Sequence, residues 1–465
     1  MRLAESRIAA VLLIVTFFAV SLLALSPLSA AEAGSSSIDS IPSMRQRVEI
    51  MERFWLWKRE IVLPSVMREQ GVDMWIIRSD EGELFFNNES PVFVSLLPAN
   101  AEGMTIPSQF ARPGSQRIPR FLLFHDRGTD IEYIEPEDYG EIGRIVREID
   151  PKRIAISDFA NETMLESLGS TYADRTIPSW TLGVRWLETA SEEQISIYSL
   201  VQRVASEIIA EGFSNRVVIP DVTTTADLNW WFRHRMLELG LEHENHPTIG
   251  VKRRPANIAK YDDPPEYFER GRTDNDMDVT IRRGDVISCD TDIMLFGLVT
   301  DSHQHAYVLE QGEIEVPADL QEALAKVNRV QDLLAAEFQT GRTGKEIVAA
   351  AEGIAFEEGV LEVDFGFHPP PMFIRRFLLG GFFFTTKPYV AGMTSGPGYY
   401  PTSIVTNDHQ LHFNTLYAFE PHTTVSVPGW GPRGVELGLG QIVAFTPDGF
   451  RYLARAQKAE WHLIR

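Results

Sequence analysis

The sequence contains a single cysteine, Cys289, among its 465 residues. One cysteine cannot form a disulfide within the chain, so the fold must be stabilised by hydrophobic cores. Basic residues are also few, 43 against 65 acidic ones, which gives a formal net charge of −22. Because phosphate binding needs a clustered basic surface, this balance argues against a nucleic-acid partner.

The composition of the chain is otherwise that of a globular protein. Hydrophobic residues make up 44% of the sequence and charged residues 23%. Neither a disordered chain nor a multi-span membrane protein is therefore expected. The length exceeds what one hydrophobic core usually spans, which predicts two domains, or three at most.

The N-terminal segment differs from the rest of the chain. Two arginines precede an apolar run from Ile8 to Leu25, and the small residues Ala31 and Ala33 follow it. This pattern predicts a signal peptide over residues 1–33, and hence an exported protein, periplasmic or extracellular. The apolar run is also just long enough to span a bilayer, so an uncleaved membrane anchor is the alternative. The serine-rich stretch 34–43 predicts a flexible leader.

Residues 44–188 alternate helical and strand patterns, which predicts a smaller α/β domain. Apolar side chains from Val48 to Ile61 recur at helical spacing. Short apolar runs at Met74–Ile77, Arg120–Phe124 and Arg153–Ile156 predict strands.

A second domain is predicted over residues 189–465. Ser191 and Thr224 each begin a helix with a capping-box pattern, and apolar stripes that include Trp230 and Met236 are expected to face a core. Two later helices are predicted at Ala318–Phe338 and Thr343–Phe356. The expected strands between and after these helices are Val286–Cys289, Met294–Val299, Ala306–Leu309, Leu416–Phe419 and Ile442–Phe445.

Three acidic residues stand at the ends of predicted strands in this domain. Asp290 and Asp301 end two successive apolar strands, and Glu420 ends a later one, directly before Pro421. If the first two strands pair, their carboxylates converge at one end of the sheet. Rigidly held carboxylate oxygens are what a divalent cation needs.

The pattern Asp290, Gly297, Asp301 and Glu420–Pro421 resembles the pita-bread metallopeptidase family, which includes aminopeptidase P, prolidase, methionine aminopeptidase and creatinase. The resemblance implies an α+β chain: a C-terminal pita-bread domain preceded by a smaller creatinase-type N-terminal domain. It also implies Asp290, Asp301 and Glu420 as metal ligands, with Mn, Zn or Co as the metal. The implied substrate is a peptide or small amide cut before proline, and the implied assembly is a homodimer.

Two histidines of the family pattern have no counterpart in this chain. The segment where the family's metal-binding histidine is expected, Ala391–Gly398, contains none, and His368 upstream is interpreted as a surface residue. Lys260 stands where a second, catalytic histidine is expected. A lysine there can donate a hydrogen bond to an oxyanion, but it transfers a proton near neutral pH only when strongly desolvated.

The family's second glutamate is also in question. Spacing places Gly440 or Gln441 at its position, and Glu436 is the only acid nearby. Strand alternation allows Glu436 to serve as a metal ligand only if the strand is shifted or bulged.

Other residues offer a possible replacement for the missing ligands. His303 points to the same side as Asp301 if the strand continues, although His303 and His305 can equally be structural. Asp292 can reach the same face, although solvation is the more usual state of an aspartate so placed.

Two functions therefore remain open. One is a metal-dependent hydrolase of the Xaa-Pro aminopeptidase type, with Lys260 and His303 as candidate catalytic residues and Asp290, Asp301, Glu420 and Glu436 as candidate ligands. The alternative is an inactive or repurposed pita-bread scaffold that binds peptides or small amides.

Overall fold

The computed structural model of the chain describes residues 36–79, 120–156, 162–241, 247–261, 266–268, 278–296, 298–360, 410–419, 421–432, 434–454, 457–458 and 460–465. The predicted signal peptide lies outside these residues. The predicted leader lies partly inside them, and its described part contains the 3-10 turn η1 (Ile38–Ser40). Among the described residues, no helix combines the length and apolarity needed to cross a membrane.

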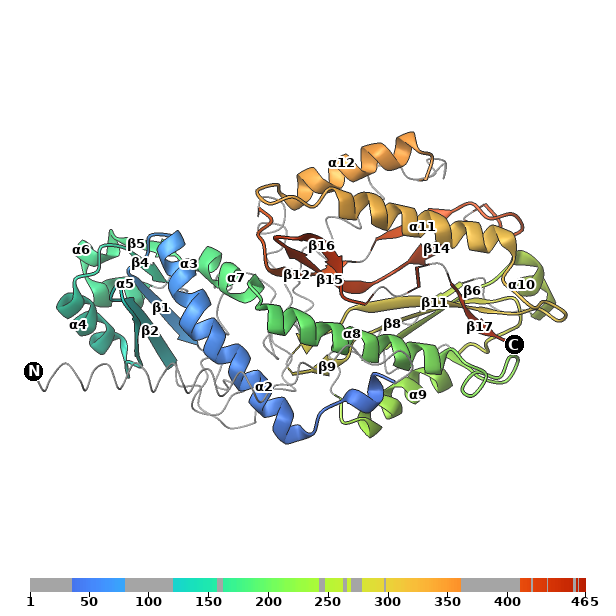
Figure 1. Cartoon of the computed structure of the whole chain (residues 1–465), viewed down its shortest axis with the longest axis horizontal. Coiled ribbons are helices and arrows are strands. Elements are labelled where there is room, and N and C mark those ends of the chain that lie inside the picture. The colour runs from blue at the N-terminus through green and yellow to red at the C-terminus, as the bar shows by residue number, and fades with distance from the viewer. Residues whose placement is uncertain are drawn as a thin grey trace, which may run out of the picture. The chain divides into compact units, whose positions relative to one another are not determined.

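The N-terminal part is a five-stranded sheet with helices on both faces (Figure 1). The strand order is β3-β2-β1-β4-β5, in which β4 and β5 run parallel to β1 while β2 and β3 complete an antiparallel edge. The strands are β1 (Met74–Ser79), β2 (Arg120–Asp126), β3 (Ile131–Ile134), β4 (Ile154–Ile156) and β5 (Thr176–Pro178). The predicted α/β character of this region is confirmed.

Alternation along β1 fills two cores. Trp75 and Ile77 face α3 (Leu63–Glu69) and α7 (Trp180–Glu188), whereas Met74 and Ile76 face the helices on the other side of the sheet. Those helices are α4 (Tyr139–Ile149) and α5 (Glu162–Leu168), and the short α6 (Ser170–Ala173) follows them. The long N-terminal helix predicted from Val48 to Ile61 is α2 (Met44–Trp57), and it continues into α3 through the π-helical turn η2 (Lys58–Val62).

The C-terminal part repeats a pattern of two helices followed by strands. The first half has α8 (Glu192–Gly212), α9 (Thr225–Glu238) and a sheet of order β17-β11-β8-β6-β7. Its strands are β6 (Thr248–Lys252), β7 (Glu266–Phe268), β8 (Val286–Thr291), β11 (Ser302–Val308) and β17 (His462–Ile464), and α10 (Pro255–Tyr261) connects β6 to β7.

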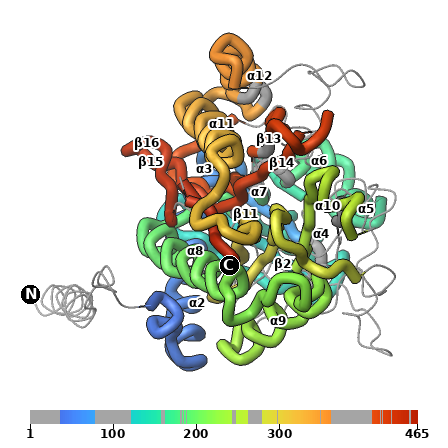
Figure 2. The backbone as a smooth tube through the Cα atoms, turned by 90° about the vertical axis from the view of Figure 1, so that its right-hand side faces the viewer, coloured from blue at the N-terminus to red at the C-terminus, as the bar shows by residue number. Residues whose placement is uncertain are grey.

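The second half has α11 (Ala318–Ala336), α12 (Gly344–Glu357) and two smaller sheets. One sheet has the order β12-β15-β16 and the other pairs β13 with β14. The bounds are β12 (Thr415–Phe419), β13 (His422–Val425), β14 (Val435–Gly438), β15 (Gln441–Thr446) and β16 (Gly449–Tyr452). Helices α8 and α11 lie on opposite sides of the strands (Figure 1, Figure 2).

The capping box predicted at Thr224 is present, the predicted box at Ser191 has only one of its two hydrogen bonds, and a further box occurs at Thr343. The Ser191 side chain accepts a hydrogen bond from the Gln194 amide at the start of α8, and Thr224 and Thr343 form reciprocal capping boxes at α9 and α12. One residue of the predicted stripe on α9 is misplaced: Met236 is buried, but Trp230 is 56% exposed and carries the Arg233 guanidinium over its ring. The Arg233 guanidinium thus stacks on the indole ring of Trp230, and this ring stays on the surface instead of joining the core.

The single strand predicted over Met294–Val299 is wrong. The segment forms two short strands, β9 (Met294–Leu295) and β10 (Leu298–Val299), which pair with each other as a hairpin. Phe296 between them has a φ of 60°, a left-handed conformation that turns the chain and that an apolar run does not reveal. Asp301 consequently precedes β11 instead of ending the strand before it.

Candidate metal centre

Strands β8 and β11 bring the first two predicted ligands together. The strands pair antiparallel, with Asp290 opposite His303 and Thr291 opposite Ser302. Strand β8 is also paired on its other edge with β6, where Thr248 lies opposite Asp290. Asp290 is therefore held on a central strand, and the ladder fixes its position relative to Asp301.

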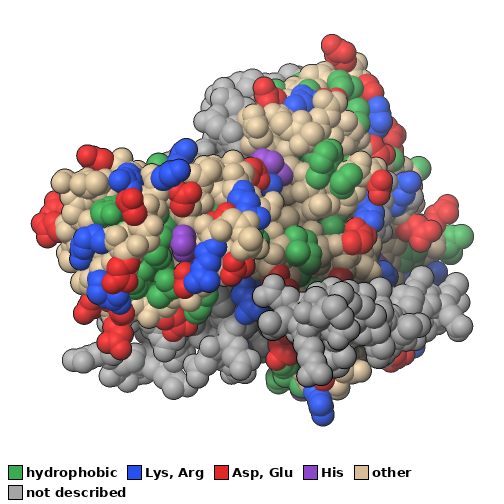
Figure 3. All heavy atoms as spheres, turned by 60° about the vertical axis from the view of Figure 1, so that its left-hand side comes forward, with side chains coloured by type: hydrophobic (Ala, Val, Ile, Leu, Met, Phe, Trp, Pro, Cys, Tyr) green, Lys and Arg blue, Asp and Glu red, His purple; other side chains and the backbone are tan. Residues whose placement is uncertain are grey.

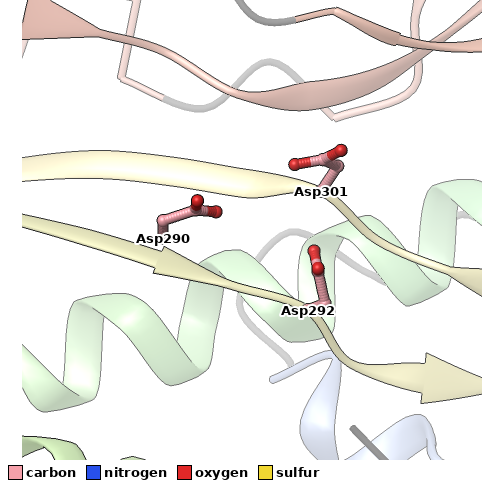
Figure 4. A group of neighbouring side chains, drawn as sticks. All are labelled: Asp290, Asp292 and Asp301. Carbon is pink, nitrogen blue, oxygen red and sulfur yellow. The ribbon is translucent and has the colours of Figure 1, made fainter. Parts of the chain in front are cut away.

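A third aspartate joins this pair. Asp290, Asp292 and Asp301 each offer a carboxylate oxygen, and these three oxygens all lie within 4.8 Å of one another. Figure 4 shows Asp290 and Asp301 on neighbouring strands and Asp292 just past β8, with its carboxylate directed toward Asp301. Asp290 is exposed, Asp292 is half-buried, and Asp301 is buried with 9% of its surface accessible. Asp292 thus reaches the face of Asp290 and Asp301, which is one of the two alternatives that the sequence left open, while it stays partly accessible to solvent.

The donor set of this acidic group suits a divalent cation. Carboxylates are hard, acceptor-only ligands, and three of them in one place repel one another unless positive charge lies between them. The group is also reachable from solvent through the exposed Asp290. The residues therefore fit one divalent ion.

Of the other predicted ligands, Glu436 is not part of this group, and Glu420 is not among the residues that the structure describes. Glu420 lies outside the described residues, directly after β12, as do the candidate His368 and the segment 391–398. Glu436 lies on β14 opposite Thr424 of β13, in a sheet separate from β8 and β11. The shifted strand that would have brought Glu436 to the aspartates is absent from the described residues, because the β13–β14 register runs without a bulge.

Gly440 has no side chain at one of the two positions, 440 and 441, where the family's second glutamate is expected. Gly440 forms an isolated bridge with His303, and a Cβ atom built on it would lie 2.9 Å from the His303 amide nitrogen and 3.1 Å from the Asp301 carbonyl oxygen. Gln441 is buried on β15 opposite Phe419, the residue before Glu420. A carboxylate side chain cannot be placed at position 440 without moving the backbone.

His303 is buried beside the acidic group but does not belong to it. Desolvation lowers the pKa of His303 to about 4, although the nearby Asp301 charge opposes this shift. His305 lies on the same face with its ring centroid 5.0 Å from that of His303, and burial lowers its pKa as well. Its Nε2 lies 2.7 Å from the Gly438 carbonyl oxygen. Both histidines are therefore neutral near pH 7, and His305 is structural.

Lys260 does not have the desolvated environment that proton transfer requires. It lies exposed on α10, where its ammonium group sits 4.5 Å from the centroid of the Tyr261 ring. A side-chain hydrogen bond with Tyr261 raises the pKa of Lys260 above its usual 10.5. It stays charged at neutral pH, so the prediction of a catalytic role is limited to hydrogen-bond donation.

The only cysteine of the chain lies next to the acidic group. Cys289 precedes Asp290 on β8, its side chain is buried, and it is a free thiol. Burial raises the pKa of this thiol well above its usual 9, and the charges of Asp290 and Asp292 add to the effect. The thiolate form, which is the reactive one, is therefore suppressed.

Comparison with known families places this geometry in context. The profile of Metallopeptidase family M24 matches residues 196–439, more than half of the chain, and the matched range includes all three aspartates. Comparison with curated proteins gives no match.

Solved structures of similar architecture come from microbial peptidases. An X-Pro aminopeptidase from Thermotoga maritima has 13% identity and a TM-score of 0.49, over 86% of this chain and 100% of that chain. An Xaa-Pro dipeptidase from Bacillus anthracis has 13% identity and a TM-score of 0.47, over 90% and 100%. A dipeptidase from Pyrococcus horikoshii has 15% identity and a TM-score of 0.46, over 89% and 99%.

Proposed function

Because the chain belongs to metallopeptidase family M24, with the pita-bread fold predicted for it, we propose that it is a divalent-metal-dependent hydrolase acting on peptide bonds. The observation that supports this proposal is the convergence of Asp290 and Asp301 within one group of carboxylates. The proposed substrate class, a peptide or small amide cut before proline, follows from the resemblance of the Asp290, Asp301 and Glu420–Pro421 pattern to aminopeptidase P.

The aspartates would hold the ion, and the exposed side of Asp290 leaves the substrate a route to it. A bound divalent ion supplies an acidified water and polarises a carbonyl group. His303 is neutral at pH 7, so it adds no positive charge that would weaken cation binding. Lys260 is cationic and carries three N–H donors but no acceptor. It can therefore donate hydrogen bonds to a developing negative charge, but it cannot accept a hydrogen bond.

A second candidate function is a pita-bread scaffold that binds peptides or small amides without cleaving them. Gly440 favours it, because the close backbone contact with His303 leaves no room for a carboxylate at one of the two positions, 440 and 441, where the family resemblance expects one. Fewer ligands mean weaker binding of a second ion, and the resemblance implies two ions for hydrolysis.

Metal content and peptide cleavage together test the proposal. The full chain, purified after incubation with Mn²⁺, Zn²⁺ or Co²⁺, is assayed for bound metal and for cleavage of Xaa-Pro peptides by chromatography. We expect at least one bound ion per chain and cleavage that chelation abolishes. Asp301→Asn should lower cleavage by at least about 100-fold. Asp448→Asn, in the exposed turn between β15 and β16, is the matched control and should leave cleavage unchanged.

Failure would take one of two forms. A chain that binds metal and peptide but cleaves no Xaa-Pro substrate would support the scaffold. A chain that binds no metal under any of the three conditions would contradict the hydrolase.

Export and assembly form a separate part of the proposal. We propose that residues 1–33 direct the chain out of the cytoplasm, on the basis of the apolar run and the small residues that follow it. Mass spectrometry of the mature protein should find an N-terminus near Gly34, whereas an intact Met1 in a membrane fraction would indicate an anchor. On the face seen in Figure 3, acidic and basic side chains of the described residues are interspersed. A homodimer remains a prediction from the resemblance.

A further inference from the structure

The acidic group differs from the ligand pattern that the resemblance implies in two ways at once. It has lost a side chain at position 440, where the backbone of Gly440 lies against His303. It has gained a carboxylate at Asp292, which the resemblance does not assign to the metal. Both changes occur around the same two aspartates, Asp290 and Asp301.

The arrangement of the backbone leaves no space for a side chain at position 440. His303 and Gly440 exchange hydrogen bonds in both directions, so the two segments approach as closely as neighbouring strands do. A Cβ on residue 440 would also lie 3.0 Å from the His303 Cβ. Because the two backbones pair directly, there is no space for a ligand side chain at position 440.

Asp292 adds its carboxylate to the group because of where it lies in the chain. The residue lies two places after Asp290, just past the end of β8, and its carboxylate oxygen lies within 4.8 Å of those of Asp290 and Asp301. Its carboxylate is half-buried and directed toward Asp301 (Figure 4).

We propose that Asp290, Asp292 and Asp301 together hold a single divalent cation, with Asp292 taking the part of the carboxylate that position 440 lacks. The inference rests on the metal centre of the proposed function and concerns its composition. Oxygens bound to one Mg²⁺- or Mn²⁺-sized ion lie about 3 to 4 Å apart, because each bond is about 2.1 Å long. The observed limit of 4.8 Å needs only small rotations of the carboxylates to reach that spacing.

Charge sets the number of ions. The three described carboxylates carry three negative charges, so one divalent ion leaves them with a net negative charge, and a second ion would need a further carboxylate, such as Glu420, which lies outside the described residues. An oxygen-only set of ligands also suits Mn²⁺, Mg²⁺ or Ca²⁺.

Isothermal titration with Mn²⁺ tests the inference on the full chain after chelation and dialysis. The wild type should bind one equivalent, and Asp292→Asn should weaken the affinity by at least about 10-fold, which corresponds to about 1.4 kcal/mol. Asp448→Asn, an equally conservative change of an exposed aspartate outside the group, should bind as the wild type does.

The melting temperature gives a second measurement that does not depend on activity. Without metal, Asp292→Asn should melt at the wild-type temperature or above it, because the change relieves repulsion among the carboxylates. The rise in melting temperature that Mn²⁺ causes in the wild type should be largely lost in the variant. A structural role for Asp292 would instead lower the melting temperature without metal and leave the Mn²⁺ affinity unchanged.

The outcomes separate this inference from the proposed function. Mn²⁺ binding that Asp301→Asn abolishes and Asp292→Asn leaves intact overturns the role of Asp292 while the metal centre stands. Two equivalents of Mn²⁺ in the wild type overturn the single-ion site. A wild type that binds no Mn²⁺ overturns both the inference and the metal-dependent function.

Discussion

His303 and Gly440 are joined by two backbone hydrogen bonds, 3.1 Å from the His303 amide to the Gly440 carbonyl and 3.0 Å in the reverse direction. This pairing connects β11, which follows Asp301, to the segment that enters β15. It brings the two halves of the C-terminal part into contact beside the acidic group. The same contact requires glycine at position 440, since a Cβ there meets backbone atoms that cannot rotate away.

The first prediction concerns this contact. Gly440→Ala should destabilise the chain by about 1–3 kcal/mol, because the added methyl overlaps the His303 backbone. Urea unfolding followed by circular dichroism measures the change. Gly353→Ala in α12 is the control, since nothing lies within 4 Å of its added Cβ, and it should stabilise the helix by up to about 1 kcal/mol. Equal effects of the two substitutions would contradict the close contact.

The second prediction concerns a buried ion pair at the start of β8. Arg253 donates two hydrogen bonds of 2.9 Å to the Asp285 carboxylate, and neither side chain is accessible. Asp285→Ala leaves the guanidinium buried without its counter-charge, so the loss of unfolding free energy should be about 3–5 kcal/mol. Glu148→Gln, which removes an exposed partner of Arg144, should leave stability unchanged in the same unfolding assay.

The third prediction is a pH dependence from Lys58. Its ammonium group is buried and donates to the Trp186 carbonyl at 2.6 Å. Desolvation lowers the pKa of Lys58 from 10.5 to about 7, against the attraction of Glu188 and with the help of Arg185. Between pH 7 and 10.5 the unfolded chain therefore binds more protons than the native one, and native stability rises with pH through this window.

Lys58→Met removes this titration. The difference in unfolding free energy between wild type and Lys58→Met should shift in favour of the wild type by up to about 4 kcal/mol from pH 7 to 10. Urea titrations at half-unit pH intervals measure it. A difference that stays flat over this range would show that Lys58 is not desolvated in the native state.

The fourth prediction tests the cap of the longest described helix. The Ser191 hydroxyl accepts a 3.0 Å hydrogen bond from the Gln194 amide. Ser191→Ala should lower stability by about 1 kcal/mol, whereas Ser191→Asp keeps an acceptor and should preserve it. Differential scanning calorimetry compares the two variants, and an equal loss in both would exclude capping as the cause.

The sequence predicted that Asp290 and Asp301 converge, although the strand that pairs with β8 is β11, which follows Asp301, and not the predicted strand before it. Asp290 and Asp301 flank a short apolar connection, and antiparallel pairing of β8 with β11 brings their carboxylates together. The capped start of α9 was also predicted, since Thr224 has an acid three residues later. In both cases the determining residues are close in the sequence.

Features that depend on distant contacts or on single dihedral angles were missed. The close approach of residue 440 to His303 joins segments over 130 residues apart, and no local pattern encodes it. The left-handed Phe296 divided a predicted strand in two, although its apolar neighbours favour an extended chain. The sequence left the position of Asp292 open between the site face and solvent, because that position depends on how the chain continues past the end of β8.

The buried thiol beside the acidic group has a practical consequence. Because Cys289 is inaccessible and its pKa is raised, maleimide and iodoacetamide reagents should leave it unmodified in the folded chain. A cysteine introduced at an exposed site then becomes the only point of attachment, without removal of the native one. Fluorophores or spin labels attached there can thus report on ion or peptide binding, because the native thiol does not react with them.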